Sequence, residues 1–280
     1  MNNILNHLKL LRPFNMLISA FAIIISSAIL GEISNFKTLI PVLFTVIFFT
    51  GAANAFNDYI DCNVDFINRP KRPIPSGKVE KKTALIISII LFFLGSLSCM
   101  ILNIYAKIIG LFISLPLIIF YSKTFKGLPL IGNVITSLIL SLSFIFCGVA
   151  FENFEPMLIP SFLAFGLTLL RELIKDIADI KGDKLSGLNT FPIYAGIKNA
   201  CNLAIIFSVI IFIFSFIPFL NGYYGFWYGL LLVLGVEIPL LVVVFLLYKK
   251  PGISMAILST KILKFSILIG LFAIYGGTLK

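Results

Sequence analysis

The stretch NAFNDYIDCNVDFINRPKRPIPSG at residues 54–77 gathers three aspartates, four asparagines and three basic residues within an otherwise apolar sequence. Over all 280 residues, 59% are hydrophobic and only 12% are charged, and the mean hydropathy is +1.07. These values lie far outside the range of water-soluble domains, so the composition indicates a polytopic membrane protein. The polar stretch therefore needs an explanation of its own.

Apolar segments that are long enough to cross a bilayer recur nine times. A hydrocarbon core of roughly 30 Å needs about 20 apolar residues per helix. The predicted spans are residues 14–31, 38–57, 83–103, 105–121, 129–150, 157–175, 199–219, 226–248 and 254–278. No linker or soluble appendage interrupts them, so we expect one all-α integral membrane domain over residues 1–280. No clean cleavage site follows the first span, which is expected to be a retained helix rather than a signal peptide.

The net charge of +10 is explained by the way basic residues are distributed among the loops. If the N-terminus is cytoplasmic, 19 of the 22 lysines and arginines lie on the inner side, against Lys37, Lys107 and Lys280 on the other. The positive-inside rule then predicts an N-in, C-out orientation for nine spans in the cell membrane. The basicity thus reflects topology and an attraction of the inner face for anions, and we expect membrane lipids rather than nucleic acid as partners.

All the aspartates of the chain fall into two short segments, at the ends of spans two and six. Together with one preceding polar residue each, both groups have the spacing i, i+4, i+7, i+11, which keeps four side chains within roughly a 60° arc of one helix. Both spans exit on the same, cytoplasmic side. The sequence therefore predicts two acidic stripes, each three turns long. They consist of Asn54, Asp58, Asp61, Asp65 and of Glu172, Asp176, Asp179, Asp183.

Each stripe is electrostatically unfavourable by itself. Like charges three or four residues apart on a helix repel each other, and the C-terminal end of a helix already carries partial negative charge. Oxygen-rich clusters of Asp and Asn suit hard cations, and Mg²⁺ is commonly held by one or two carboxylates together with the phosphate oxygens of a substrate. The two stripes favour a two-sided Mg²⁺ and diphosphate site. Solvated helix ends would explain one such triplet, but explain two matching ones poorly.

The two acidic segments also match known motifs. The pattern N-D-x-x-D-x-x-x-D at residues 57–65 and the pattern D-x-x-D-x-x-x-D at residues 176–183 resemble the two signature motifs of the UbiA superfamily of intramembrane prenyltransferases. Further segments match in the same order: LRPFN before span one, INRPKRPIPSG after the first motif, YSKTFKG after span four, GN at residues 132–133, and TFPIYAG after the second motif. The resemblance implies a nine-helix bundle with a lateral, lipid-facing cavity. Two Mg²⁺ ions would hold a prenyl diphosphate there while the prenyl group moves to an acceptor in the membrane.

The resemblance also implies roles for individual residues. The metal ligands would be Asn57, Asp58, Asp61 and Asp65 for one ion, and Asp176, Asp179 and Asp183 for the other. The catalytic set would comprise Asp61, Asp65, Asp176, Asp179 and Lys123, around metal ions that stabilise the diphosphate leaving group. The substrate-binding candidates are Arg12, Asn15, Asn54, Arg72, Tyr121, Lys123, Arg171 and Lys175. An inside-positive loop would also account for Arg72, and an interfacial aromatic belt would also account for Tyr121.

The sequences of the two motif segments are most similar to those of one archaeal branch of the superfamily. The segments are NDYIDCNVDFINRPKRPIPSG and RELIKDIADIKGD. That branch transfers geranylgeranyl from geranylgeranyl diphosphate to the hydroxyl of geranylgeranylglyceryl phosphate, in ether-lipid biosynthesis. Chlorophyll synthases have nearly the same loop sequences, and quinone-pathway members share the aspartates. Chlorophyllide or an aromatic quinone precursor is therefore the alternative acceptor. A cation-coupled transporter is a rival from another class, although transporter sites usually lie near the bilayer midplane on broken helices. The sequence does not indicate an oligomeric state.

Glu237 lies near the middle of span eight, two residues before Pro239. A carboxylate at that depth is costly, so it should face the interior of the bundle. Two interpretations stay open at this point. Glu237 is either a functional residue, or a structural one that is protonated and bonded to backbone carbonyls freed by Pro239.

Overall fold

The computed structural model describes residues 2–279, with side chains from Leu5 onward, so Lys280 lies outside the described residues. Within that range the chain is helical and contains no strand. It divides into two compact units. The first unit comprises the chain up to Phe125 together with Leu142–Glu155, and the second comprises Lys126–Ser141 together with the chain from Pro156 onward.

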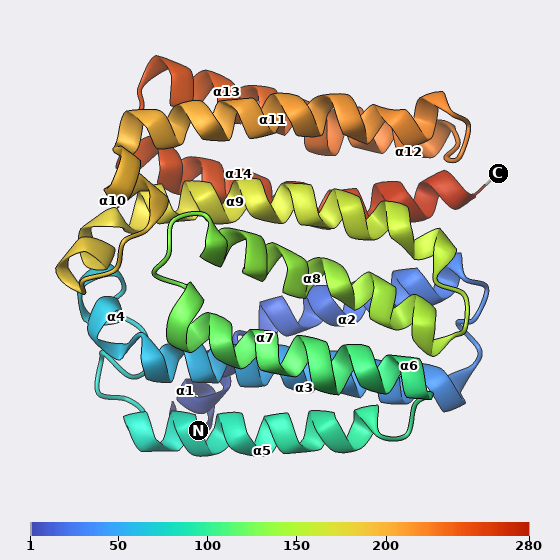
Figure 1. Ribbon diagram of the computed structural model, residues 1–280, viewed down its shortest axis with the longest axis horizontal. Coiled ribbons are helices and arrows are strands. Elements are labelled where there is room, and N and C mark those ends of the chain that lie inside the picture. Colours follow the sequence, from blue (N-terminus) through green and yellow to red (C-terminus); the bar gives the residue numbers. More distant parts are fainter. Residues whose placement is uncertain (1, 280) are drawn as a thin grey trace. The chain divides into compact units, whose positions relative to one another are not determined.

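The first unit holds the first acidic motif. Its helices α3 and α5 lie side by side (Figure 1), and Gly95 of α5 allows this approach because a Cβ atom there would lie 2.5 Å from the Phe49 ring. The elements of this unit are α1 (Asn2–Leu11), α2 (Pro13–Ile29), α3 (Phe36–Ile60), α4 (Cys62–Asn68), α5 (Lys81–Cys99), α6 (Ile104–Lys107), η1 (Ile108–Ser114), α7 (Leu115–Phe120), η2 (Tyr121–Phe125) and the last part of α8 (Ile131–Ala150).

The second unit holds the second acidic motif on its longest helix, α9, which packs against both α11 and α14 (Figure 1). The elements of this unit are the first part of α8, then α9 (Leu158–Leu185) after the short turn η3 (Glu155–Met157), α10 (Phe191–Ala195), α11 (Ile197–Leu220), α12 (Phe226–Leu232), η4 (Val233–Glu237), α13 (Ile238–Lys249) and α14 (Ile253–Thr278).

Two apolar clusters in the first unit fix the positions of its helices. The larger one joins α2, α3, α5, α6 and the end of α8 through buried residues that include Ile23, Val42 and Phe146. The smaller one consists of Leu10, Cys62, Ile74, Val79 and Ala84. It therefore holds the segment between α4 and α5 against α1 and α4, and this segment carries Arg72.

Eight helices of the described chain are long and apolar enough to cross a membrane. The predicted first span corresponds to α2, which has only 17 residues. A ninth span results only if α2 is counted together with residues Leu5–Leu11 of α1, to which it is bent by 49°. The break falls at Arg12 because Pro13 disfavours a helical backbone at the residue before it. The prediction of nine spans therefore holds only if this bent pair is one span.

Wide π-helical turns interrupt two of the spans. The π turn η1 ends at Ser114, two residues before Pro116. The π turn η4 ends at Glu237, two residues before Pro239. Proline has no N–H to donate to the carbonyl of the preceding turn, and its ring crowds that carbonyl. A wider turn just before each proline accommodates this without ending the span.

Candidate functional site

The first acidic motif straddles a break between two helices. Helix α3 ends at Ile60 and α4 begins at Cys62, with Asp61 between them at φ −80° and ψ 5°. The expected single stripe on one continuous helix is therefore wrong for this motif. The helical hydrogen-bond pattern nevertheless continues through the break, since the N–H groups of Asp61 and Asp65 donate to the carbonyls four residues earlier at 2.8 Å. Asp58, Asp61 and Asp65 consequently remain buried, at 3%, 7% and 4% exposure.

Two arginines neutralise this motif. The Oδ1 atom of Asp58 accepts hydrogen bonds from Nη2 of Arg12 and, at 3.1 Å, from Nη1 of Arg72. The same Nη1 of Arg72 also pairs with Oδ2 of Asp65. Burial raises the pKa of the Asp65 carboxyl, an effect opposed by the guanidinium of Arg72, and burial lowers the pKa of Arg72. Arginine still stays charged, so the network is ionic. Its side chains are mostly buried, so it is only partly solvated.

Arg12 reaches Asp58 from the break between α1 and α2. Its backbone is left-handed, with φ 50° and ψ 71°, a conformation that costs a non-glycine residue about 1–2 kcal/mol. Asn54 helps to hold this junction, because its Nδ2 donates to the carbonyl of Leu11 at 2.9 Å and its Oδ1 lies 3.4 Å from Nη1 of Arg12. Asn15 is half-buried on the first turn of α2, where its N–H donates to the carbonyl of Arg12 at 2.8 Å.

Arg72 is presented by a chain segment that is compact without being helical. A hydrogen bond of 3.0 Å joins the Ser76 N–H to the Arg72 carbonyl, and another of 2.9 Å joins the Lys78 N–H to the Pro73 carbonyl. Ile74 is buried in the smaller apolar cluster of this unit. The backbone of the segment is thereby fixed, while the side chain of Arg72 extends to the aspartates.

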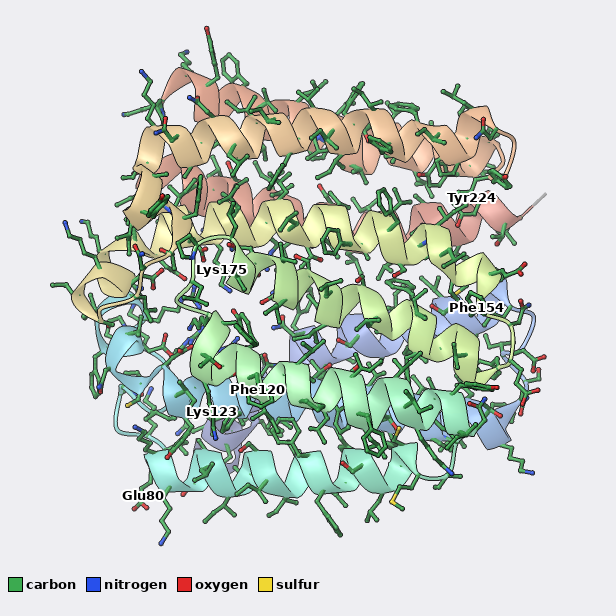
Figure 2. The ribbon with its side chains drawn as sticks, viewed as in Figure 1. Glu80, Phe120, Lys123, Phe154, Lys175 and Tyr224 are labelled. Carbon is green, nitrogen blue, oxygen red and sulfur yellow. The ribbon has the colours of Figure 1, made fainter. Side chains whose placement is uncertain are left out.

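The YSK segment meets the first motif through its serine. Ser122, in η2, donates a hydrogen bond to Oδ1 of Asn57. Its neighbour Tyr121 is half-buried and Lys123 is exposed. Within the described chain no acidic side chain pairs with Lys123. It lies at the end of the first unit where α3 runs into α4 (Figures 1 and 2).

The second motif lies on one continuous helix, as expected. Helix α9 carries Glu172, Asp176, Asp179 and Asp183, and of these Glu172 and Asp183 are buried. Glu172 accepts hydrogen bonds from Arg171 Nη1 at 2.8 Å and from Lys175 Nζ at 2.6 Å. Lys175 is labelled on α9 in Figure 2.

An amide, rather than a guanidinium, contacts Asp176. The Nδ2 atom of Asn133, near the start of α8, donates to Oδ2 of Asp176 at 2.8 Å. Asn133 is buried. A neutral donor of this kind orients the carboxylate without neutralising it.

The oxygen donors of both motifs fit Mg²⁺. Among the described residues, no three His, Cys, Asp or Glu side chains converge into a ready-made metal cage. Mg²⁺ does not require one, because it usually binds one or two carboxylates and completes its coordination with water and substrate phosphate. The available ligands are carboxylate and amide oxygens without sulfur or imidazole, a set that suits a hard cation.

Sequence reasoning missed two residues that contact the motifs. Ser122 lies between the two YSK residues selected as candidates, and Asn133 belongs to the GN pair that contributed to the family resemblance. Both were within matching segments, so the signal was present. Their roles depend on contacts between residues 65 and 43 positions apart, which spacing does not reveal.

Glu237 faces the interior of the second unit, as expected, and is 2% exposed. Its partner is a side chain, since the hydroxyl of Ser215 lies 2.7 Å from its Oε1 atom. Among the described residues, no backbone carbonyl bonds to Glu237, so the structural interpretation does not hold in the form in which it involved carbonyls freed by Pro239. Tyr228 completes this cluster by donating to the carbonyl of Ser215 at 2.6 Å.

These features define a class of protein. Apolar helices of membrane length, with buried aspartates at helix ends and basic residues around them, make this a multi-pass membrane protein with a candidate site for a hard cation and a polyanion. The chain belongs to the UbiA prenyltransferase family, whose model matches residues 16–268.

Individual relatives agree with this assignment. A digeranylgeranylglyceryl phosphate synthase from Methanosphaera stadtmanae is 39% identical over 209 residues, which cover 75% of this chain and 76% of the relative. A solved structure described as digeranylgeranylglyceryl phosphate synthase in membranes has a TM-score of 0.78 at 32% identity, over 100% of this chain and 99% of that one. A UbiA homolog from Archaeoglobus fulgidus bound to GPP and Mg²⁺ shares the fold, with a TM-score of 0.68 at 18% identity over 96% of this chain and 99% of that chain.

Proposed function

We propose that this protein transfers a geranylgeranyl group from geranylgeranyl diphosphate to the hydroxyl of geranylgeranylglyceryl phosphate, giving digeranylgeranylglyceryl phosphate for archaeal ether lipids. The support for this substrate pair is the similarity along the whole chain to a solved structure of that enzyme, at 32% identity. The 39% identical relative has the same name. A buried acidic motif and a partly buried one, both rich in oxygen ligands, are the chemistry that such a reaction needs.

Mg²⁺ is the cofactor in this proposal, with one ion at each motif. Asn57, Asp58, Asp61 and Asp65 would hold one ion, and Asp176, Asp179 and Asp183 the other. When bound, Mg²⁺ neutralises charge on the diphosphate as the allylic C–O bond breaks. The Archaeoglobus fulgidus homolog, bound to GPP and Mg²⁺, supports magnesium use in this fold.

Cationic side chains would bind the remaining phosphate oxygens. Lys123 is the strongest candidate, because it is exposed and no acidic side chain of the described chain pairs with it. Arg171 and Lys175 share Glu172 as their partner, and Lys175 keeps donors for an anion after that pairing. The acceptor hydroxyl must also lose a proton, which a motif carboxylate or a diphosphate oxygen would take.

The orientation and the entry route belong to the same proposal. The basic loops support an N-in, C-out arrangement, in which both motifs face the cytoplasm. Both substrates carry long apolar chains that should not cross water, so we propose a lateral opening of the bundle to the lipid.

The experiment that tests this function is a two-substrate assay with purified protein. Radiolabelled geranylgeranyl diphosphate and geranylgeranylglyceryl phosphate are supplied with Mg²⁺, and labelled ether lipid is the expected product. A parallel reaction replaces the acceptor with a quinone precursor, and a third with chlorophyllide. Transfer to either of these, without any ether lipid, would overturn the acceptor assignment. No transfer to any acceptor would contradict the proposed activity.

A further inference from the structure

The arginines of the first motif occupy the carboxylates that the proposed function assigns to Mg²⁺. Arg12 and Arg72 converge on the same oxygen of Asp58, and Arg72 continues to Asp65. The result is one connected chain of charges, Arg12, Asp58, Arg72 and Asp65. It joins the break between α1 and α2, the end of α3, the helix α4 and the segment that follows it.

Both guanidiniums are attached to irregular backbone. Arg12 lies at a helix break with left-handed dihedral angles, and Arg72 lies on the non-helical segment after α4. By contrast, Asp58 lies inside α3 and Asp65 inside α4. The basic side chains can therefore change partners by rotating about their own long stems, without disrupting a helix.

Charge makes such an exchange necessary. Ionised buried carboxylates are strongly destabilising when they lose their partner, so Asp58 and Asp65 need a cation in every state in which they are ionised. Two guanidiniums carry the same charge as one Mg²⁺ ion. The planar fork of arginine matches a carboxylate and a phosphate equally well, so a guanidinium displaced from an aspartate is suited to a diphosphate.

We propose that Arg12 and Arg72 are exchangeable counter-cations: they neutralise Asp58 and Asp65 in the metal-free protein and transfer to the diphosphate when Mg²⁺ binds. This inference rests on the proposed function. It gives the two arginines a role that diphosphate binding alone does not include. They compete with Mg²⁺ for the aspartates when no diphosphate is present, and they strengthen the binding of diphosphate when Mg²⁺ is bound. At Asp176 of the second motif no arginine of the described chain takes this role, because the hydrogen-bond partner of Asp176 is the neutral amide of Asn133.

The test measures ligand binding by the stability of the purified full-length protein, without turnover. Thermal unfolding is followed in EDTA, in a titration with Mg²⁺ alone, and in a titration with inorganic pyrophosphate at fixed Mg²⁺. The variant is Arg72→Gln. The matched control is Lys71→Gln, which removes one positive charge from the adjacent, exposed residue, and Lys71 has no acidic partner in the described chain.

For Arg72→Gln we expect a lower Tm in EDTA and a half-saturating Mg²⁺ concentration reduced about tenfold, since an adjacent competing charge has been removed. The half-saturating pyrophosphate concentration should rise about tenfold, as a charge-assisted contact is lost. The control should change neither concentration more than about twofold, because exposed charges interact weakly. Arg12→Gln should change both in the same directions and serves in place of Arg72→Gln if that variant does not fold.

The outcomes separate the inference from the function on which it rests. If Mg²⁺ with pyrophosphate does not stabilise even the unsubstituted protein, the proposed function and the exchange both fail. If the unsubstituted protein is stabilised, but Arg72→Gln needs as much Mg²⁺ or more, the exchange alone is wrong and Arg72 is a static partner of the aspartates.

Discussion

At the scale of single residues, Asp61 and Asp183 test the metal assignment most directly. Both are buried, and each lies within one of the two motifs. Asp61→Ala or Asp183→Ala should lower kcat on the order of 100-fold or more. Each substitution removes a carboxylate that would hold a Mg²⁺ ion, and the charge of that ion would stabilise the transition state. The assay is prenyl transfer at limiting and at saturating Mg²⁺.

Glu80→Ala is the control for this pair. Glu80 is an exposed carboxylate just before α5 whose side chain makes no capping hydrogen bond (Figure 2). Its removal should leave kcat unchanged. Full turnover by Asp61→Ala or Asp183→Ala at limiting Mg²⁺ would contradict the metal assignment.

Asn133 offers a second prediction at this scale. Its amide orients Asp176, and loss of a group that orients a metal ligand typically costs about 10–100-fold in metal affinity or activity. Asn133→Ala should therefore raise the Mg²⁺ concentration for half-maximal transfer about tenfold, measured by titration with Mg²⁺ at saturating prenyl diphosphate. Asn199→Ala, which removes an exposed amide bonded to the carbonyl of Ala195 at the end of α10, should not. Equal Mg²⁺ requirements for the two variants would show that Asn133 does not act through Asp176.

The residues of the motifs could be predicted from the sequence, but their partners could not. Aspartate and asparagine spacing predicts which oxygen atoms share a helix face, and so the proposed metal ligands, because it depends only on local helix geometry. The pairing of Arg12 with Asp58 joins residues 46 positions apart, and it arises because Pro13 breaks a helix at that point. Spacing carries no information about such contacts.

At the scale of elements, the second motif followed its predicted geometry and the first did not. Helix α9 contains no proline after Pro160, so nothing interrupts it across the motif. The break at Asp61 has no proline or glycine to mark it in the sequence. The π turns before Pro116 and Pro239 were equally invisible to hydropathy, which measures composition rather than hydrogen bonding.

The hydrogen bond that joins η4 to α11 predicts the role of Glu237. The single hydroxyl proton of Ser215 has two acceptors within reach, the Phe212 carbonyl at 3.0 Å and Glu237 at 2.7 Å. If Glu237 is protonated, the conflict disappears, because its carboxyl group would donate to Ser215 and the Ser215 hydroxyl would donate to Phe212. The other carboxyl oxygen of Glu237 is buried and has no hydrogen-bond partner, which also favours the neutral form.

Glu237→Gln should therefore preserve both Tm and prenyl transfer, because an amide can make the same donation. Glu237→Ala should lower stability by about 2–4 kcal/mol, through a cavity and a lost hydrogen bond. Thermal unfolding and the transfer assay are measured for both variants. If Glu237→Gln is as inactive as a motif variant while its Tm is unchanged, Glu237 is a functional acid and the structural interpretation is wrong.

At the scale of the whole molecule, hydropathy and motif order predict the family, since both depend on features spread along the entire chain. The family match over residues 16–268 confirms this level of the prediction. Hydropathy alone does not decide between eight and nine spans, for a physical reason. The bent pair of α1 and α2 has the length of a span, yet its first part contains polar residues and ends at a break.

The proposed N-in, C-out orientation gives the final prediction. Lys71 and Lys37 are both exposed, and the positive-inside rule assigns them to opposite sides of the membrane. The native cysteines are all buried, so the unsubstituted protein should react slowly with a membrane-impermeant maleimide. In sealed right-side-out vesicles, Lys37→Cys should be labelled at once, and Lys71→Cys only after the membrane is permeabilised. The reverse pattern would place both acidic motifs outside, and the basic loops would then require another explanation.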